Sequence, residues 1–286
     1  MQAPTREGKQ SMEYLIFERE GPVGWLRLNR PDKLNSWTVP MWEEMAKLGA
    51  ELVADPELRA LVVIGEGRAF SSGIDTSSFN PAQSRGVFAE AGSGAPTEVV
   101  GDDPLVTTIT DLQGCYSWLA EAPYPTIAAV RGFALGAGLQ LALACDLRIV
   151  ARGTRLGLPE HRYGLLPDLG GLYWLPKVVG TAKAKELVWT GEQIDAEEAH
   201  RIGLANRLVD DDDLEAEATR LAEALAAQPP LAVSGSKRAI DAAAGQSLAE
   251  AMREAAVGQA HCIRSPDFIE AISAFAAGRK PNYGNR

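Results

Sequence analysis

The sequence is poor in residues that usually hold metal ions or close disulfides. Its 286 residues include three cysteines and three histidines. Cys115, Cys145 and Cys262 lack the paired spacing of a metal site or a redox motif, and no two histidines share helical spacing. We therefore expect no bound metal, and we expect reduced structural thiols in a cytoplasmic protein.

Positive charge is also scarce, because the formal net charge is −10 at pH 7. A nucleic-acid-binding surface needs clustered Lys and Arg, so we expect no nucleic-acid partner. The longest uncharged apolar run, residues 132–145, is too short to cross a bilayer, and the N-terminus lacks the apolar core of a signal peptide. We expect no membrane partner, although a few local cations could still hold a phosphorylated ligand.

What the chain does contain is a repeated pattern of short apolar runs. Runs at residues 60–65, 126–130 and 155–160 each enter a glycine-bearing turn, which is followed by a helix-like segment. An apolar run without polar alternation is typical of a strand covered on both faces. The pattern predicts an α/β fold in which helices wind around a sheet.

Other segments give clear local predictions. Apolar residues at 14–18 and 23–28 predict an N-terminal hairpin, and the Met and Trp spacing over 38–53 predicts an amphipathic helix. Residues 80–105 are rich in Gly, Pro, Ser, Ala and acids, which is typical of a long surface loop. From Thr181 onward the strand signals stop and helical spacing dominates.

The most informative stretch is the glycine-rich turn at residues 131–138. Gly136 and Gly138 lead into an Ala/Leu-rich segment that predicts a buried helix. The free N–H groups at such a helix start can bind a ligand oxygen that carries negative charge. The alternative is that the two glycines only allow tight packing of the helix on a sheet. Neither a dinucleotide fingerprint nor a serine-hydrolase elbow is present in the sequence.

Several separated motifs, taken in order, resemble those of the crotonase superfamily, the enoyl-CoA hydratase and isomerase family. The resemblance runs from about Met12 to Tyr283. The motifs are Asn29-Arg30-Pro31 with Asn35, Gly67-x-Ala69-Phe70-x-Ser72-Gly73-Ile74-Asp75, Gly132-Phe133-Ala134-Leu135-Gly136-Ala137-Gly138, Leu158-Pro159-Glu160, Pro167-Asp168-Leu169-Gly170-Gly171, and Arg279-Lys280-Pro281-Asn282-Tyr283. Each is weak alone, whereas the ordered set is specific.

The resemblance implies a crotonase-like spiral of ββα turns with a C-terminal helical region. On this view residues 1–12 are a flexible leader, and residues 13–210 form an acyl-CoA-binding core. Residues 211–286 form a helical region that packs between subunits of a homotrimer or a dimer of trimers. No prosthetic group is implied, because coenzyme A enters as part of the thioester substrate.

The resemblance also implies roles for particular residues. The backbone N–H groups of Ile74 and Ala137 would bind the thioester oxygen as it gains charge, and such a donor is worth about 3 kcal/mol of barrier. Residues implied to contact coenzyme A are Lys33, Leu34, Ser72, Gly73, Asp75, Gly136, Arg279 and Lys280. For Lys33, Arg279 and Lys280, solvated charge without a ligand is an equal alternative, and phosphate binding could occur across a subunit interface.

The choice of reaction depends on two positions. Hydratases of this family use two glutamates, and the corresponding positions here hold Gln140 and Glu160. A glutamine can orient water or a carbonyl, but it cannot accept a proton as a base. We therefore predict double-bond isomerisation of an enoyl-CoA with Glu160 as the proton shuttle. Hydration with Gln140 positioning water, thioester hydrolysis, and a silent acyl-CoA-binding paralogue remain alternatives.

Asp168 is a further candidate, because it follows Glu160 by eight residues. An aspartate at this spacing is a second acid/base in the family's dienoyl-CoA isomerases. The alternative is that Asp168 caps a helix starting near Leu169, just as Gln140 could simply be a buried residue bonded to backbone. The loop at 80–105 is longer than is usual in the family, and we predict that it sets acyl-chain selectivity.

Overall fold

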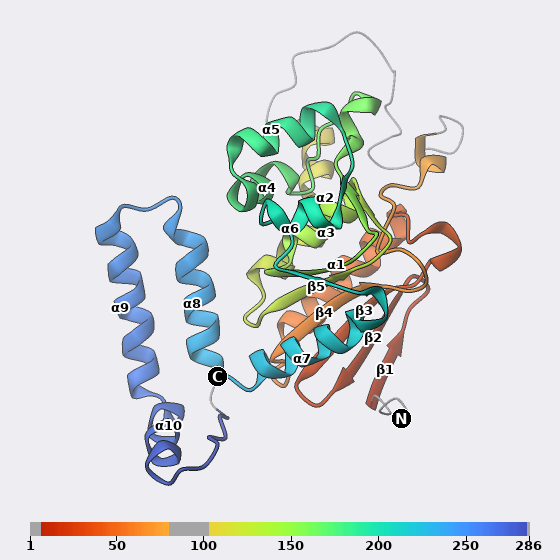
Figure 1. Cartoon of the computed structure of the whole chain (residues 1–286). Helices are drawn as coiled ribbons and strands as arrows, with labels where there is room; N and C mark the ends of the chain where they lie inside the picture. Colours follow the sequence, from red (N-terminus) through yellow and green to blue (C-terminus); the bar gives the residue numbers. More distant parts are fainter. Residues whose placement is uncertain (1–6, 80–102, 285–286) are drawn as a thin grey trace.

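The computed structural model describes residues 7–79 and 103–284, and a seven-stranded sheet runs through its centre (Figure 1). The strand order is β1-β2-β3-β4-β5-β7-β10. Neighbours from β1 to β3 are antiparallel, and those from β3 to β10 are parallel. The strands are β1 (Glu7–Ser11), β2 (Leu15–Glu20), β3 (Val23–Leu28), β4 (Ala60–Gly65), β5 (Thr126–Val130), β7 (Leu147–Ala151) and β10 (Arg207–Val209).

A second, three-stranded sheet and ten α-helices complete the architecture. The small sheet has the order β6-β8-β9, with β6 (Phe133–Leu135), β8 (Arg155–Gly157) and β9 (Ile194–Asp195). The helices of the described residues are α1 (Val39–Val53), α2 (Pro104–Glu121), α3 (Ala137–Ala144), α4 (Gly171–Val179), α5 (Thr181–Thr190), α6 (Ala196–Arg201), α7 (Leu214–Ala226), α8 (Pro230–Ala243), α9 (Leu248–Arg264) and α10 (Pro266–Ala276). The predicted α/β class is confirmed.

Strand β4 shows why the apolar runs form the centre of the sheet. All six of its residues are buried. Successive side chains point to opposite faces of a strand, so Leu61 and Val63 join the core cluster that includes α1. Val62 and Ile64 join the cluster that includes α7. The hairpin of β2 and β3 and the helix α1 also form where the sequence predicted them.

Three short strands differ from the expectations. Residues 7–11, placed in a flexible leader, form β1, in which Gln10 pairs with Phe17 of β2. Strands β9 and β10 lie in the region where no strand was expected; β9 is antiparallel to β8, and β10 is parallel to β7. All three are short edge strands, and none carries the apolar alternation that predicts a strand.

The C-terminal third is helical as predicted, but it divides into two parts. Helix α7 packs on the sheet through Leu214, Ala218 and Leu221, so it belongs to the core rather than to a separate region starting at residue 211. Helices α8 to α10 form an arm that stands away from the sheet (Figure 1), and α8 and α9 contribute no buried residue.

One side chain of α8 ties the arm to the core. The Lys237 ammonium lies 2.9 Å from Asp146 Oδ2, and it donates to the carbonyl oxygens of Leu119 at 3.1 Å and Tyr124 at 3.2 Å. Its side chain is only 10% exposed. A buried ammonium must be paired and hydrogen-bonded to be tolerated, and here all three of its protons have acceptors.

The predicted selectivity loop lies mostly outside the described residues, because these resume at Asp103 after Phe79. Asp103 caps α2 by accepting from the Leu105 N–H at 2.8 Å. Among the described residues, no helix is long and apolar enough to cross a membrane. The same residues contain no group of three or more His, Cys, Asp or Glu side chains placed to hold a metal ion.

We predict that Lys237→Met loosens the arm, because three core acceptors then lose their donor. The expected cost is about 1–3 kcal/mol, and hydrogen–deuterium exchange should rise over residues 230–276 more than over β4 and β5. Lys183→Met, on the surface of α5, is the matched control and should leave the exchange of the arm unchanged. Equal exchange of the arm in both variants would contradict the anchoring role.

Candidate active site

Two glycine turns meet at the carboxyl ends of β4 and β5. Gly73 has φ +100° and Gly136 has φ +51°, conformations that L side chains rarely adopt. A Cβ atom on Gly73 would lie 2.9 Å from the Leu135 carbonyl oxygen, and one on Gly136 would lie 3.9 Å from the Gly73 Cα. A parallel bridge between Ser71 and Ala134 holds the segments together. The glycines therefore allow two backbone turns to face each other without side chains between them.

Each turn presents a backbone N–H group. The Trp37 N–H donates to the Gly73 carbonyl at 2.8 Å, and in a trans peptide the next N–H, that of Ile74, points the opposite way. Ala137 is the first residue of α3, so its N–H has no acceptor inside the helix. Within the residues that the structure describes, neither N–H has an acceptor. The two predicted oxyanion donors are thus brought together.

Close packing also depends on this turn, as Gly138 shows. A Cβ atom there would lie 2.5 Å from the Ser71 carbonyl oxygen. This glycine is therefore required for close packing of α3, whereas Gly136 is required for the turn itself. The stretch at residues 131–138 therefore determines both the packing of α3 and the position of the Ala137 N–H.

Glu160 lies against the same turn, in the 3-10 helix Pro159–Tyr163. Its side chain points at Gly136, whose Cβ position would be 3.3 Å from Glu160 Oε1. The residue is 7% exposed, and Oε2 has no hydrogen-bond partner among the described residues. Burial raises the pKa of the Glu160 carboxyl to about 7, because the charged form loses its hydration. A carboxyl with such a pKa can take up and release protons near neutral pH.

Gln140 holds Glu160 in this position. It is 2% exposed and lies one turn after Ala137 on α3. Its Nε2 donates to Glu160 Oε1 at 2.8 Å, and its Oε1 accepts from the Gly171 N–H at 3.1 Å. Both ends of the amide are engaged, so Gln140 is at once bonded to backbone and a positioning residue for Glu160. The free carboxylate oxygen, Oε2, is the one left for a substrate.

Asp168 lies near Glu160 but in a different setting. It is exposed, and it borders a groove of about 870 Å³ together with Gln113 of α2 and Trp174 of α4. Its charge adds to the effect of burial in raising the pKa of Glu160, and Gln113 lies beside its carboxylate. The helix-capping alternative is wrong, because the N-cap of α4 is Gly170 and makes no side-chain cap.

The residues implied to bind coenzyme A fall into two groups, one beside the glycine turns and one near the C-terminus. Leu34 and Ser72 are adjacent, because the Ser72 N–H donates to the Leu34 carbonyl at 2.9 Å. Lys33 precedes them on an exposed turn beside the site. Asp75 is already engaged in an ion pair with Arg30 at 3.0 Å. Of the first group, the loop at 33–34 therefore remains the part that is open to a ligand.

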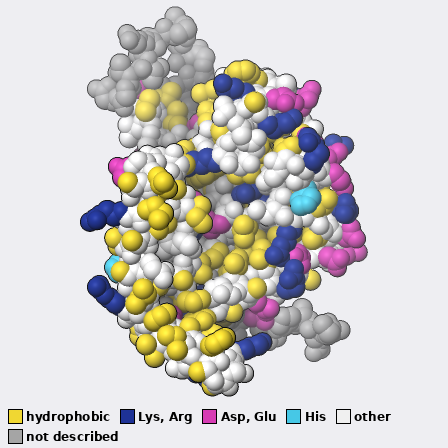
Figure 2. All heavy atoms as spheres, turned by 60° about the vertical axis from the view of Figure 1, so that its left-hand side comes forward, with side chains coloured by type: hydrophobic (Ala, Val, Ile, Leu, Met, Phe, Trp, Pro, Cys, Tyr) yellow, Lys and Arg dark blue, Asp and Glu magenta, His cyan; other side chains and the backbone are white. Residues whose placement is uncertain are grey.

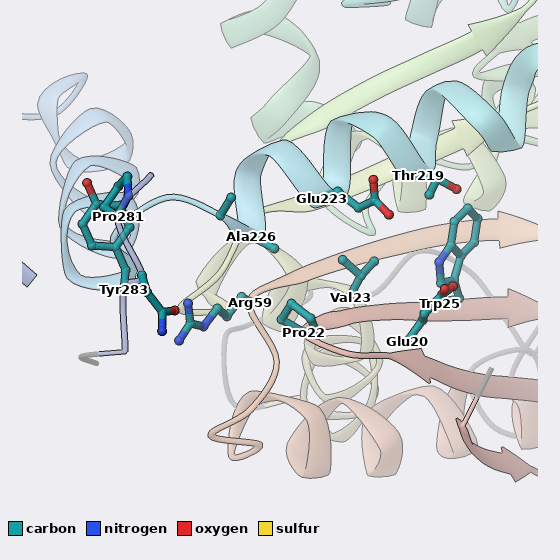
Figure 3. Close-up of a pocket in the computed structure, with 12 residues that line it drawn as sticks. Glu20, Pro22, Val23, Trp25, Arg59, Thr219, Glu223, Ala226, Pro281 and Tyr283 are labelled. Carbon is teal, nitrogen blue, oxygen red and sulfur yellow. The ribbon is translucent and has the colours of Figure 1, made fainter. Parts of the chain in front are cut away.

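Arg279 and Lys280 form the second group, and one chain does not bring them to its own site. Arg279 pairs with Glu270 at 2.6 Å. The tail that follows lines a pocket of about 340 Å³, in which Pro281 and Tyr283 approach Pro22 and Arg59 (Figure 3). These core residues precede the starts of β3 and β4, so the tail lies at the opposite end of the strands from the glycine turns.

Three residues with a structural link to the site escaped the sequence reasoning. Trp37 fixes the Gly73–Ile74 peptide, yet it lies just before the helix predicted at 38–53 and carried no signal of its own. Arg30 pairs with Asp75, and the Asn29-Arg30-Pro31 motif was the only signal that it carried. Gln113 was likewise unmarked, because a single glutamine on an amphipathic helix predicts nothing.

Comparison with known proteins gives consistent matches over the whole chain. A family model described as Enoyl-CoA hydratase/isomerase matches residues 18–286. The chain is 33% identical to the probable enoyl-CoA hydratase echA8 of Mycobacterium bovis over 274 residues, which cover 96% of this chain and 99% of that protein. It is 35% identical to the 1,2-epoxyphenylacetyl-CoA isomerase of Escherichia coli K12 over 277 residues, which cover 95% of this chain and 98% of that protein.

A solved structure is similar at the level of the backbone. The chain from Thermobifida fusca YX in complex with acetoacetyl-CoA superposes with a TM-score of 0.79 at 35% identity. The match covers 87% of this chain and 94% of that chain. A TM-score at this level shows that the two chains share a fold.

The burial of Glu160 predicts a pH-dependent cost to stability. Its pKa is about 7 in the folded chain and ordinary when unfolded, so wild-type stability falls as pH rises from about 4.5 to 7. Glu160→Gln removes this loss and should raise the free energy of unfolding by up to about 3 kcal/mol at pH 8, with little change at pH 4.5. Urea titrations at both pH values measure the difference.

Glu192→Gln provides the control, because Glu192 is exposed. This variant should change the free energy of unfolding by the same small amount at both pH values. If Glu160→Gln behaved like Glu192→Gln, the carboxyl would not be desolvated in the folded protein.

Proposed function

This chain belongs to the enoyl-CoA hydratase/isomerase family, and from this premise we propose that it moves the double bond of a 3-enoyl-CoA to the 2-position. Members of this family act on coenzyme A thioesters without a prosthetic group. The observation that carries the proposal is the buried carboxylate of Glu160 beside two backbone N–H groups that have no acceptor among the described residues. One base that can both remove and return a proton is sufficient for isomerisation.

The reaction begins at C2 of the substrate. Glu160 Oε2 takes a proton from C2, the electron pair of the C–H bond forms a C1–C2 double bond, and the π pair of the carbonyl moves onto the thioester oxygen to give a dienolate. The negative charge that develops on the thioester oxygen is stabilised by the N–H groups of Ile74 and Ala137. The same carboxyl then returns the proton to C4, which leaves the double bond between C2 and C3. No proton is gained or lost overall.

Gln140 supports isomerisation over two-carboxylate hydration. Its amide oxygen accepts from Gly171 and its amide nitrogen donates to Glu160. Because a side-chain amide neither gains nor loses a proton near neutral pH, it cannot share acid and base roles with Glu160. Its contribution is to fix Oε1 so that Oε2 faces the substrate.

Hydration is the second candidate, because the Mycobacterium bovis relative is named a probable enoyl-CoA hydratase. In that reaction Glu160 would activate a water molecule and Gln140 would help to position it. The exposed Asp168 could supply a second carboxylate only by approaching the site from the rim of the groove. Thioester hydrolysis and a silent acyl-CoA-binding role are further outcomes of the same assay.

Coenzyme A is proposed to run from the glycine turns toward the loop of Lys33 and Leu34. Acetoacetyl-CoA bound to the Thermobifida fusca neighbour supports an acyl-CoA as the ligand. Arg279 and Lys280 lie away from the site of their own chain. They would therefore reach the phosphates of a substrate only in a neighbouring subunit.

The arm of α8 to α10 supports self-association. Its exposed large hydrophobic residues are Ile240, Leu248, Met252, Val257, Ile263, Phe268, Ile269, Ile272 and Phe275. Figure 2, which brings the arm forward, shows hydrophobic side chains gathered along it. An apolar surface of this kind marks a protein interface. We propose that a second copy covers it in a homotrimer or a dimer of trimers, where the arm would also border the partner's groove.

We predict that the purified protein converts 3-enoyl-CoA to 2-trans-enoyl-CoA, followed by absorbance and chromatography. In the free enzyme, kcat/KM should rise with pH around the Glu160 pKa of about 7, because only the ionised carboxylate removes a proton. Glu160→Gln should lower kcat by about 10³-fold. In D₂O, deuterium should appear at C2 of recovered substrate and at C4 of product.

Each competing function gives a different result in this assay. Formation of 3-hydroxyacyl-CoA from 2-trans-enoyl-CoA at a higher kcat/KM than isomerisation would replace the proposal with hydration. Release of free coenzyme A would indicate thioester hydrolysis. Tight acyl-CoA binding without turnover or deuterium exchange would indicate a binding protein.

We predict that Met252→Glu combined with Phe275→Asp gives a monomer, since two charges then replace apolar side chains that are 65% and 90% exposed. Analytical ultracentrifugation should show a trimer or hexamer for the wild type. Trp189→Glu, a similar change at an exposed site on α5, should keep at least the trimer. A monomeric wild type would contradict the proposed role of the arm.

A further inference from the structure

An ion pair lies directly behind the oxyanion donor Ile74. Arg30 Nη2 is 3.0 Å from Asp75 Oδ2, and both side chains are 17% exposed. The Ser36 hydroxyl donates to the same oxygen at 3.3 Å. The other carboxylate oxygen, Oδ1, accepts from the Ser77 N–H at 3.1 Å and from its hydroxyl at 2.8 Å. With both oxygens bonded inside the protein, Asp75 is not placed to contact coenzyme A.

The loop that carries Arg30 is itself held rigidly. Asn35 is fully buried with φ +53°, and its side chain accepts from the Arg30 N–H at 2.8 Å. Its amide nitrogen donates to the carbonyls of Glu66 at 3.0 Å and Ala69 at 2.8 Å. The Arg30 guanidinium also donates to the Ser36 carbonyl. The loop that carries Arg30 is therefore fixed to the core beside β4.

The fixed position of Asp75 restrains the Ile74 N–H through the main chain. The Asp75 N–H donates to the Trp37 carbonyl at 2.9 Å, and the Trp37 N–H donates to the Gly73 carbonyl at 2.8 Å. These two bonds form an isolated bridge that belongs to no sheet. Because the peptide between Gly73 and Ile74 is planar, the direction of the Ile74 N–H depends on this bridge.

We propose that Arg30 and Asp75 are positioning residues that hold the bridge closed and aim the Ile74 N–H at the thioester oxygen. This inference rests on the proposed function of the site. A donor stabilises the oxyanion only when it lies about 2.7–3.1 Å from the oxygen's position in the transition state. A small displacement of residues 73–75 would leave substrate contacts in place while weakening this one bond.

Asp75→Asn tests the proposal, because the amide keeps the size of the side chain and removes its charge. We expect kcat to fall about tenfold with KM within about twofold of the wild type, the pattern of an interaction made only in the transition state. Arg30→Lys, which keeps the charge but loses the planar fork, should give a smaller fall. Asp55→Asn breaks the Arg19–Asp55 pair, 3.1 Å in length and far from the turns, and should leave kcat unchanged.

A spectroscopic measurement separates positioning from general structural support. The thioester carbonyl frequency of a bound acyl-CoA reports the donors directly, so it should move toward its free-solution value in Asp75→Asn and Arg30→Lys but not in Asp55→Asn. A higher KM with unchanged kcat would overturn the proposal and restore Asp75 as a ligand contact. A lower kcat with an unchanged carbonyl frequency would also overturn it.

The frequency measurement needs binding but no turnover. A wild type that shifts the carbonyl frequency without isomerising substrate would therefore contradict the proposed function and still test the positioning role. If Asp75→Asn failed to fold, Ser36→Ala would serve instead, because it removes one bond to the same carboxylate. The expected frequency change is then smaller and in the same direction, and no change would overturn the proposal.

Discussion

The planarity of one peptide bond governs the whole site. The carbonyl of Gly73 is bound to Trp37, so the N–H of Ile74 must project from the other side of the same plane. The opposing donor, Ala137, is set by the start of α3 in the same way. A main-chain N–H donor functions with many different side chains at its position. It loses its hydrogen bond to the substrate oxygen, however, when the backbone moves by even a small distance. This explains why the surrounding sequence is rich in glycine and why its side chains brace the backbone.

The second constraint is the burial of Glu160 among backbone and amide groups. A buried carboxylate that forms no ion pair loses hydration that no cation replaces, and burial therefore raises its pKa in the folded protein. Gln140 limits this cost by donating to one oxygen, but as a neutral group it leaves the other oxygen basic. A glutamate at position 140 would place two like charges beside each other and would make a different acid/base pair. The proposed choice of isomerisation over hydration therefore rests on the identity of residue 140.

Much of this arrangement could be predicted from the sequence because it follows from local pattern. The apolar runs of β4 and β5 and the glycine-bearing turns predicted the α/β class, and the ordered set of motifs implied the crotonase-like fold; both are confirmed. The polar strand β1 and the short strands β9 and β10 were missed because they carry no apolar alternation of their own. The pairing of Arg279 with Glu270 was not predicted, because a paired charge and a solvated charge look the same in a sequence. A cytoplasmic location stays a prediction.

The polar pairs were the hardest to foresee, because a charged residue in a loop looks the same whether it is solvated or paired. Asp75 illustrates the difference. The motif around it suggested a contact with coenzyme A, whereas in the structure its carboxylate forms an ion pair with Arg30. The loop at 30–36 consequently has two faces. One, at Lys33 and Leu34, is open toward the proposed path of coenzyme A, and the other holds the segment of Ile74 through Arg30 and Asn35. If coenzyme A follows the proposed path, its contacts at the open face fall on the same loop that holds the proposed oxyanion donor, so substrate binding and transition-state stabilisation share one support.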